Sequence, residues 1–105
     1  TWLHVSDTAE AIITIIEANV VNEIYNISGN YEEQNIIIAM KICDEFCHGN
    51  IDYMNQLDLG IKRPGQDVRY SIDDSKLKNL GWQPKANFDV ELKKIVDYYR
   101  DHFVW

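Results

Sequence analysis

The sequence lacks the glycine-rich loop with which many enzymes hold a dinucleotide. Its five glycines stand at positions 29, 49, 60, 65 and 81, and neither a G-x-G-x-x-G pattern nor a looser relative can be formed from them. No tyrosine is followed by lysine four positions later, so a Tyr/Lys proton-transfer pair is missing as well. We therefore expect no catalytic residue and no cofactor-binding residue within these 105 residues.

Long apolar runs and positive charges are also scarce. No stretch approaches the roughly 20 apolar residues of a membrane-spanning helix, and no signal peptide is recognisable. Ten Lys and Arg residues stand against seventeen Asp and Glu residues, which gives a net charge of −7. A field of that sign repels nucleic acid and anionic membranes, so neither is expected as a partner. An anionic small molecule could still bind where the few cations cluster.

Cysteine is limited to Cys43 and Cys47, four positions apart in a helical pattern. Side chains at this spacing on one helix are poorly oriented for a disulfide, so free thiols in a reducing, cytoplasmic location are expected. With His48 they would supply three candidate metal ligands, but both thiols lie on an apolar stripe. Packing is the preferred interpretation, and no metal site is predicted.

The composition is that of a folded domain, because 46% of the residues are hydrophobic and disordered chains contain far fewer. The length suits a single domain over residues 1–105. The chain begins T-W-L-H-V-S-D, without methionine and inside a β-like run. We therefore expect it to be a fragment of a longer protein.

Hydrophobic periodicity predicts four helices and a few short strands. Strands are expected at residues 2–5, 23–27, 51–54 and 69–72. Helices are expected from a capping box at Asp7 and Glu10, from Asn35 to Gly49, from Asp73 to Leu80, and from Asn87 or Asp89 towards the C-terminal end. Because helices and short strands alternate, the expected fold class is mixed α/β with a small sheet.

Lys62, Arg63 and Arg69 gather around the corner formed by Pro64 and Gly65. Pro64 fixes φ and Gly65 permits a positive φ, which suits a type II turn. Such a turn holds its neighbours rigidly, and the planar guanidinium of Arg63 can pair with a phosphate or a carboxylate through two hydrogen bonds. A solvated surface turn is the alternative interpretation.

Other polar and aromatic residues also have two interpretations. Asn35 stands at a helix start, where it can cap the helix or reach an anionic ligand. His4 near Asp7 suggests an acid–base pair, but no motif places a Ser or Cys nucleophile, so a structural role is preferred. The three tryptophans, Trp2, Trp82 and Trp105, are interpreted as core and interface anchors.

Four motifs follow one another in the chain: W-L-H-V-S-D, I-Y-N-I-S-G-N-Y-E-E-Q-N, R-P-G-Q-D-V-R-Y-S-I-D and G-W-Q-P. Together they resemble, over essentially the whole chain, the C-terminal third of the dTDP-glucose 4,6-dehydratases. These lyases are nucleotide-sugar-modifying members of the extended short-chain dehydrogenase/reductase family. The R-P-G motif with G-W-x-P downstream is specific to them and to near relatives, while UDP-sugar epimerases and decarboxylases share a looser version.

The resemblance implies a substrate-binding domain that works with a separate Rossmann domain, present in cis or in trans. That second domain would bind NAD and carry the catalytic Tyr/Lys pair, so NAD is implied for the complete enzyme only. Arg63 and Asn35 correspond to residues that contact the nucleotide diphosphate of the substrate. Gln66 stands where these enzymes usually have histidine, so a neutral donor replaces a titratable one. The implied partner is a nucleotide-sugar, most of all a dTDP-sugar.

Two alternatives remain open at this point. The chain could belong to a UDP-sugar epimerase or decarboxylase, or it could be a binding or partner module without catalysis.

In the family that it resembles, the first strand and helix pack against the larger domain. We therefore expect an exposed apolar patch that includes Trp2 and part of the Ile12–Ile16 stripe.

Overall fold

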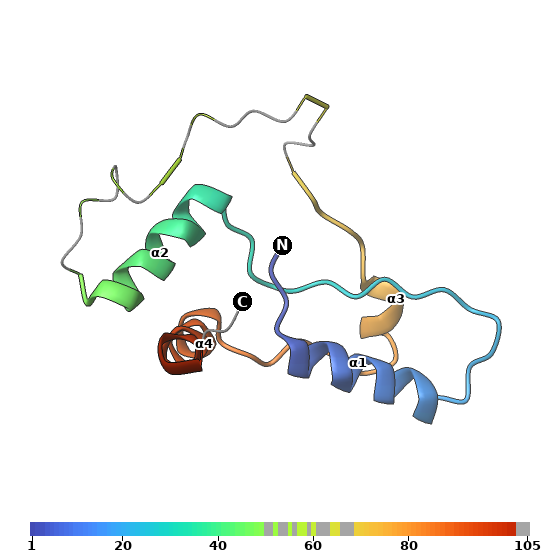
Figure 1. Ribbon diagram of the computed structural model, residues 1–105. Helices are drawn as coiled ribbons and strands as arrows, with labels where there is room; N and C mark the ends of the chain where they lie inside the picture. Colours follow the sequence, from blue (N-terminus) through green and yellow to red (C-terminus); the bar gives the residue numbers. More distant parts are fainter. Residues whose placement is uncertain are drawn as a thin grey trace. The chain divides into compact units, whose positions relative to one another are not determined.

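The computed structural model describes residues 1–49, 52, 55, 57–58, 60, 64–65 and 69–102. Four helices form within these residues, α1 (Val5–Glu17), α2 (Asn35–Cys47), α3 (Ser75–Lys78) and α4 (Phe88–His102) (Figure 1). The chain divides into two compact units. Unit 1 comprises Thr1–Glu32 and Arg69–Phe88, and unit 2 comprises Glu33–Val68 and Asp89–Trp105.

The expected strands at residues 2–5, 23–27 and 69–72 do not form. Within the described residues, β pairing is limited to one antiparallel bridge between Trp2 and Tyr31. Residues 23–27 are extended but pair with no neighbouring strand in that part of the chain. The mixed α/β prediction is therefore correct for the helices and wrong for these three strands. The fourth expected strand, at 51–54, falls outside the described residues except for Asp52.

Residues 24–27 alternate between exposed and partly buried side chains, although they build no sheet. Tyr25 and Ile27 pack against the core of unit 1, while Ile24 between them is 85% exposed. Asn26 donates from Nδ2 to the carbonyl of Asp73 at 2.9 Å. A side-chain hydrogen bond and core packing thus hold this segment in place of the expected strand ladder. An alternating pattern indicates that one face of a segment is buried, but it does not identify a strand with which the segment could pair.

Helix α1 begins earlier than the sequence predicted. His4 is its N-cap, and the ring Nδ1 accepts from the backbone N–H of Ser6 at 3.2 Å. The capping box at Asp7 and Glu10 is therefore wrong, since Asp7 already lies in the first turn of α1 and is buried. The carboxylate of Asp7 accepts hydrogen bonds from backbone N–H groups in the segment after α3.

Helix α2 confirms the predicted bounds, with a different residue at its start. Gln34 is the N-cap, and its side chain makes no capping hydrogen bond. Asn35 is the first helical residue, so the prediction that Asn35 caps the helix is wrong. His48 closes the helix in the left-handed conformation and Gly49 follows it, as predicted for a C′ position.

Helix α3 is shorter than expected, and its N-cap is Asp74 and not the predicted Asp73, although Asp73 does bind the first helical residue. Asp73 Oδ1 accepts from the backbone N–H of Ser75 at 2.9 Å and from its hydroxyl at 2.5 Å. The hydrogen bond from the Ser75 hydroxyl, followed by the one from its backbone N–H, lowers the pKa of the Asp73 carboxyl below its ordinary value. The chain continues as a turn into Gly81. Helix α4 begins at Phe88, immediately after Asn87, which was one of the two predicted starts.

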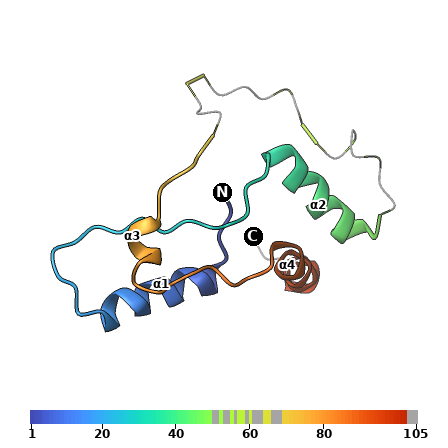
Figure 2. The same ribbon diagram turned by 180° about the vertical axis from the view of Figure 1, so that it is seen from behind.

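The core of unit 1 lies where α1, α3 and the segment after α3 meet (Figure 2). Ala11, Leu77 and Trp82 are its buried residues. Partly buried side chains surround them: Leu3, Ile15, Tyr25, Ile27 and Leu80. Trp82 is thus the core anchor that the sequence predicted, whereas Trp105 lies outside the described residues.

The opposite side of α1 is exposed, in agreement with the expected apolar patch. Ile12, Ile13 and Ile16 are 49%, 52% and 67% exposed. Trp2 is also exposed, although its ring and that of Phe88 lie in a T-shaped arrangement. Helix α1 is therefore apolar on two faces, and unit 1 buries only the face that carries Ala11.

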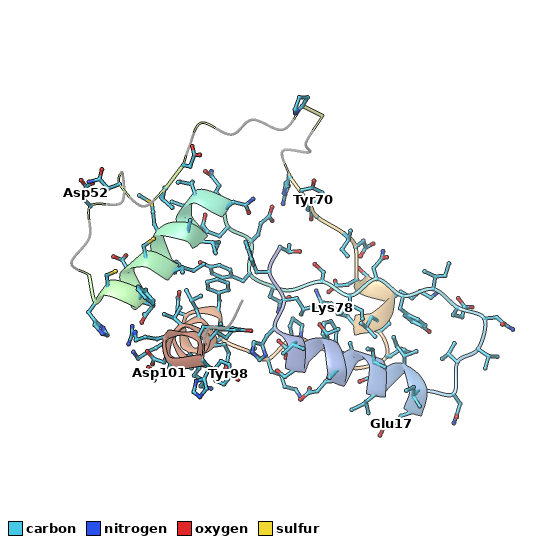
Figure 3. The ribbon with its side chains drawn as sticks, in the orientation of Figure 1. Glu17, Asp52, Tyr70, Lys78, Tyr98 and Asp101 are labelled. Carbon is cyan, nitrogen blue, oxygen red and sulfur yellow. The ribbon has the colours of Figure 1, made fainter. Side chains whose placement is uncertain are left out.

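Unit 2 contains α2 and most of α4, whose Tyr98 and Asp101 are labelled in Figure 3. Ile38 and Val96 are buried in it, and Lys41 on α2 pairs with Asp89 at 2.5 Å. Arg100 donates from Nη2 to the carbonyls of Glu45 and Phe46 at 2.9 and 3.0 Å. Because the last carbonyls of a helix lack partners inside it, Arg100 fastens α4 to the C-terminal end of α2.

The predicted apolar face of α4 is only partly buried. Val96 is buried and Leu92 is partly buried, but Ile95 and Tyr99 are exposed. Phe103, the last member of the predicted face, lies outside the described residues.

Candidate functional site

The Pro64–Gly65 corner has the conformation that the sequence predicted. Both residues are exposed and form a turn, and Gly65 has a φ of +74°. A type II turn requires a positive φ near this value at its third residue. Two predicted site residues adjoin the corner, Arg63 and Gln66, and both lie outside the described residues together with Lys62.

Asn35 is the predicted site residue that the structure describes. It is exposed at the first position of α2, and its amide has no hydrogen-bond partner within the described part of the chain. The first turn of α2 contains no acidic residue. Because the first backbone N–H groups of a helix have no partner inside it and the helix dipole is positive there, this end can receive an anion.

Arg69, the second arginine of the R-P-G-Q-D-V-R-Y motif, is bound to Glu32. Its Nη2 donates to Oε2 of Glu32 at 2.8 Å, and its Nε donates to Oε1. This two-bond pairing is the strongest geometry available to an arginine and a carboxylate. Sequence reasoning counted Arg69 only as extra charge near Arg63 and missed its partner, because nothing in the sequence links two residues 37 positions apart.

The pair alters the pKa values of both groups. The hydrogen bond from Arg69 lowers the pKa of Glu32 below its ordinary value of 4.5. The hydrogen bond to Glu32 raises the pKa of Arg69 above its ordinary value. The pKa of Glu32 is lower in the folded chain than in the unfolded chain. The pair therefore stabilises the fold fully above pH 4.5 and loses this contribution as the pH falls through the lowered pKa.

We therefore predict a pH-dependent effect of Glu32→Gln. At pH 7 the variant should have a lower free energy of unfolding than the unsubstituted chain, and the difference should narrow as the pH falls below the ordinary pKa of Glu32 and through its lowered pKa. Urea denaturation followed by circular dichroism at several pH values measures this difference. A difference that stays constant over the whole range would show that the pair contributes nothing through its charge.

The remaining candidates have structural partners. His4 Nδ1 accepts from Ser6, and both carboxylate oxygens of Asp7 accept from backbone N–H groups. Cys43 and Cys47 are free and partly buried. In residues 1–49, 69–102 and the shorter described stretches, no three His, Cys, Asp or Glu residues are grouped to hold a metal ion. No helix among these residues is long and apolar enough to cross a membrane.

Comparison with known proteins identifies the wider group. The family model described as GDP-mannose 4,6 dehydratase matches residues 1–95. The chain is 36% identical over 108 residues to dTDP-glucose 4,6-dehydratase 1 of Escherichia coli. It is 40% identical over 110 residues to the dTDP-glucose 4,6-dehydratase of Xanthomonas campestris, and 37% identical over 112 residues to that of Neisseria meningitidis.

These matches cover almost the whole chain but a minor part of each relative. They include 99% of this chain, and 30%, 31% and 32% of the three relatives. The chain therefore spans about a third of the length of the curated relatives that it matches. Because the family model extends over residues 1–95 of 105, this chain belongs to the GDP-mannose 4,6 dehydratase family, and it is similar over 99% of its length to dTDP-glucose 4,6-dehydratases.

Proposed function

We propose that this chain is the nucleotide-sugar-binding part of an NAD-dependent sugar-nucleotide 4,6-dehydratase that converts dTDP-glucose to dTDP-4-keto-6-deoxyglucose. The observation that carries the proposal is the similarity over 99% of the chain to proteins named dTDP-glucose 4,6-dehydratase. The exposed Pro64–Gly65 turn supports it, as does the start of α2, where the N-cap Gln34 makes no side-chain capping hydrogen bond, because each is a suitable place for a diphosphate.

In this proposal the diphosphate is held from two sides. Arg63 pairs with its oxygens through two hydrogen bonds, and the turn at Pro64 and Gly65 limits the directions in which Arg63 can extend. Asn35 donates its amide to the same group from the start of α2. Gln66 adds a neutral donor. Binding at the nucleotide end is independent of the sugar, so its free energy serves to orient the hexose for reaction elsewhere.

The residues of this chain do not fit NAD. The segments before α1, α2 and α4 end in His4, Gln34 and Asn87, and no strand with a glycine-rich turn precedes any of these helices within the described residues. No Tyr/Lys pair occurs in the 105 residues. The proposal therefore assigns NAD and the reacting groups to another part of the enzyme. The 105 residues alone are expected not to turn over dTDP-glucose.

We predict that dTDP binds this chain saturably and that Arg63→Ala weakens the binding about tenfold or more, since a charge-assisted pair is lost. Asn35→Ala should weaken it less, because a neutral donor is removed. Calorimetric titration with dTDP, UDP and GDP measures both effects. Lys94→Ala is the matched control, because Lys94 is an exposed cation that, among the described residues, pairs with Glu91 one turn away.

The titration also separates the alternatives. Preference for UDP would favour an epimerase or decarboxylase of UDP-sugars, and preference for GDP would favour the substrate named by the family model. Binding that Arg63→Ala leaves unchanged would contradict the proposed site. The absence of any binding would favour the alternative of a non-catalytic partner module that does not bind a nucleotide.

A further inference from the structure

The ion pair between Glu32 and Arg69 joins the two places where the polypeptide enters and leaves unit 1. Unit 1 ends at Glu32 and resumes at Arg69. The two residues therefore mark where the polypeptide leaves unit 1 and where it returns. A backbone hydrogen bond holds the residue next to Glu32, since the N–H of Trp2 donates to the carbonyl of Tyr31 at 2.8 Å. Tyr70, labelled in Figure 3, marks the returning segment as it leads to α3.

The residues proposed to hold the diphosphate are short distances along the chain from this pair. Asn35 follows Glu32 by three residues, which can span at most about 10–11 Å. Gly65 precedes Arg69 by four residues, which can span at most about 13–14 Å. Joining Glu32 to Arg69 therefore restricts how far the start of α2 can be from the Pro64–Gly65 turn, although 30 positions separate Asn35 from Gly65.

The geometry favours a positioning role for Arg69 over direct contact with the substrate. Both Nε and Nη2 of its guanidinium are already bound to the carboxylate of Glu32. That carboxylate neutralises the charge that a phosphate would need. Exposed ion pairs generally add little to stability, and the exception is the two-bond arginine–carboxylate geometry seen here. A modest local free energy is sufficient to restrict two chain segments.

We infer that Glu32 and Arg69 form a latch that positions the start of α2 and the Pro64–Gly65 turn for binding one nucleotide diphosphate. The inference rests on the proposed function for the identity of the ligand, but the latch itself is a property of the free chain. It assigns to Arg69 and Glu32 one shared role, so neither residue touches the nucleotide.

The test compares Glu32→Gln, Arg69→Gln, the double variant and the charge exchange Glu32→Arg with Arg69→Glu. The matched control is Glu23→Gln, which removes the carboxylate from another exposed long-range ion pair of unit 1, Glu23 with Lys76. The first measurement is the ¹⁵N relaxation of the Gly65 amide without ligand. We expect Gly65 to become more mobile in each single variant, to be restored by the charge exchange, and to be unchanged in the control.

The second measurement is the dissociation constant for dTDP. Each single variant should weaken binding about threefold to tenfold, and the double variant should be no weaker than either one. If Arg69→Gln weakens binding while Glu32→Gln does not, Arg69 contacts the ligand and the latch is overturned. Unchanged Gly65 relaxation in both single variants overturns it as well. If the unsubstituted chain binds no nucleotide, the proposed function fails, and the Gly65 measurement still decides the latch.

Discussion

Asp7→Ala is expected to lower the free energy of unfolding by about 3 kcal/mol, because it removes a charged acceptor from two backbone donors. Asp7 is 3% exposed in the first turn of α1. Its Oδ1 accepts from the N–H of Lys85 at 3.0 Å, and its Oδ2 accepts from the N–H of Ala86 at 3.1 Å. The carbonyl of Asp7 also accepts from Nε1 of Trp82 at 3.1 Å. Asp7 thus joins α1 to the G-W-Q-P segment.

Asp7→Asn separates the hydrogen bonds from the volume of the side chain. Asparagine keeps one oxygen acceptor but turns an NH₂ group towards the second backbone N–H, so two donors face each other. We expect a loss of about 2 kcal/mol, close to that of alanine. Urea denaturation at pH 7, followed by circular dichroism, measures both variants.

The matched control for this prediction is Glu10→Gln. Glu10 lies on the same helix one turn later, and its carboxylate meets Nζ of Lys85 at 2.8 Å on the exposed surface. Such an exposed pair contributes little to the free energy of unfolding. If Asp7→Asn proves as stable as the unsubstituted chain, or if Glu10→Gln costs as much as Asp7→Asn, the buried carboxylate does not hold the two segments together.

The role of Asp7 shows why local patterns in this sequence were only partly informative. Asp7 with Glu10 fits a capping box, and sequence reasoning assigned the carboxylate to the nearest free N–H groups. The structure gives it to donors 78 and 79 positions away. Such a choice depends on tertiary contacts. By contrast, Asp73 does bind its neighbour Ser75, and Gly49 and Gly81 do follow their helices, since these features depend on local geometry alone.

Extended segments were found where strands were predicted, and the difference has a physical cause. At residues 23–27 the sequence indicated Ile24 as the apolar residue of a strand, but Ile24 is exposed and the partly buried side chains are Tyr25 and Ile27. The sequence also could not indicate whether another segment offers its backbone as a hydrogen-bonding partner. Ladder formation is a non-local property, whereas the helices satisfy their own backbone groups and were found near their predicted bounds.

In the candidate site, too, the local features could be predicted from the sequence and the long-range contacts could not. The turn at Pro64 and Gly65 follows from two residue types with fixed backbone preferences, and it was predicted from the sequence alone. The assignment of Arg63, Asn35 and Gln66 to a diphosphate came from the resemblance of whole motifs. The pairing of Arg69 with Glu32 required the structure, because a surface arginine in an acidic chain has many possible partners.

The second large effect is expected for Gly29→Ala, which should lower the free energy of unfolding by more than about 3 kcal/mol. Gly29 lies where the first residues of the chain cross the segment before α2. A Cβ atom at this position would be 1.7 Å from the carbonyl oxygen of Trp2, 2.6 Å from its carbonyl carbon and 3.2 Å from Cα of Leu3. All three are backbone atoms, so no side-chain rotation can make room.

Relief of this clash would require the two backbones to separate. Separation would break the bond from the N–H of Trp2 to the carbonyl of Tyr31. It would also displace Leu3, which packs against the core, and the N-cap His4 that immediately precedes α1. The cost therefore combines a lost hydrogen bond with disturbed packing, and the urea midpoint should fall accordingly.

Gly60→Ala is the matched control, because it adds the same methyl group at a position where the near atom belongs to a side chain and not to the backbone. The nearest atom to a Cβ at Gly60 is Oδ1 of Asp58 at 3.2 Å, the end of an exposed side chain that can move. This change should alter the free energy of unfolding by no more than about 0.5 kcal/mol, since exposed positions tolerate substitution. If Gly29→Ala were as stable as Gly60→Ala, the Trp2–Tyr31 bridge would open at negligible cost. The first residues of the chain would then not be fastened to the segment that leads into α2, and that segment carries Glu32 and ends immediately before the proposed diphosphate ligand Asn35.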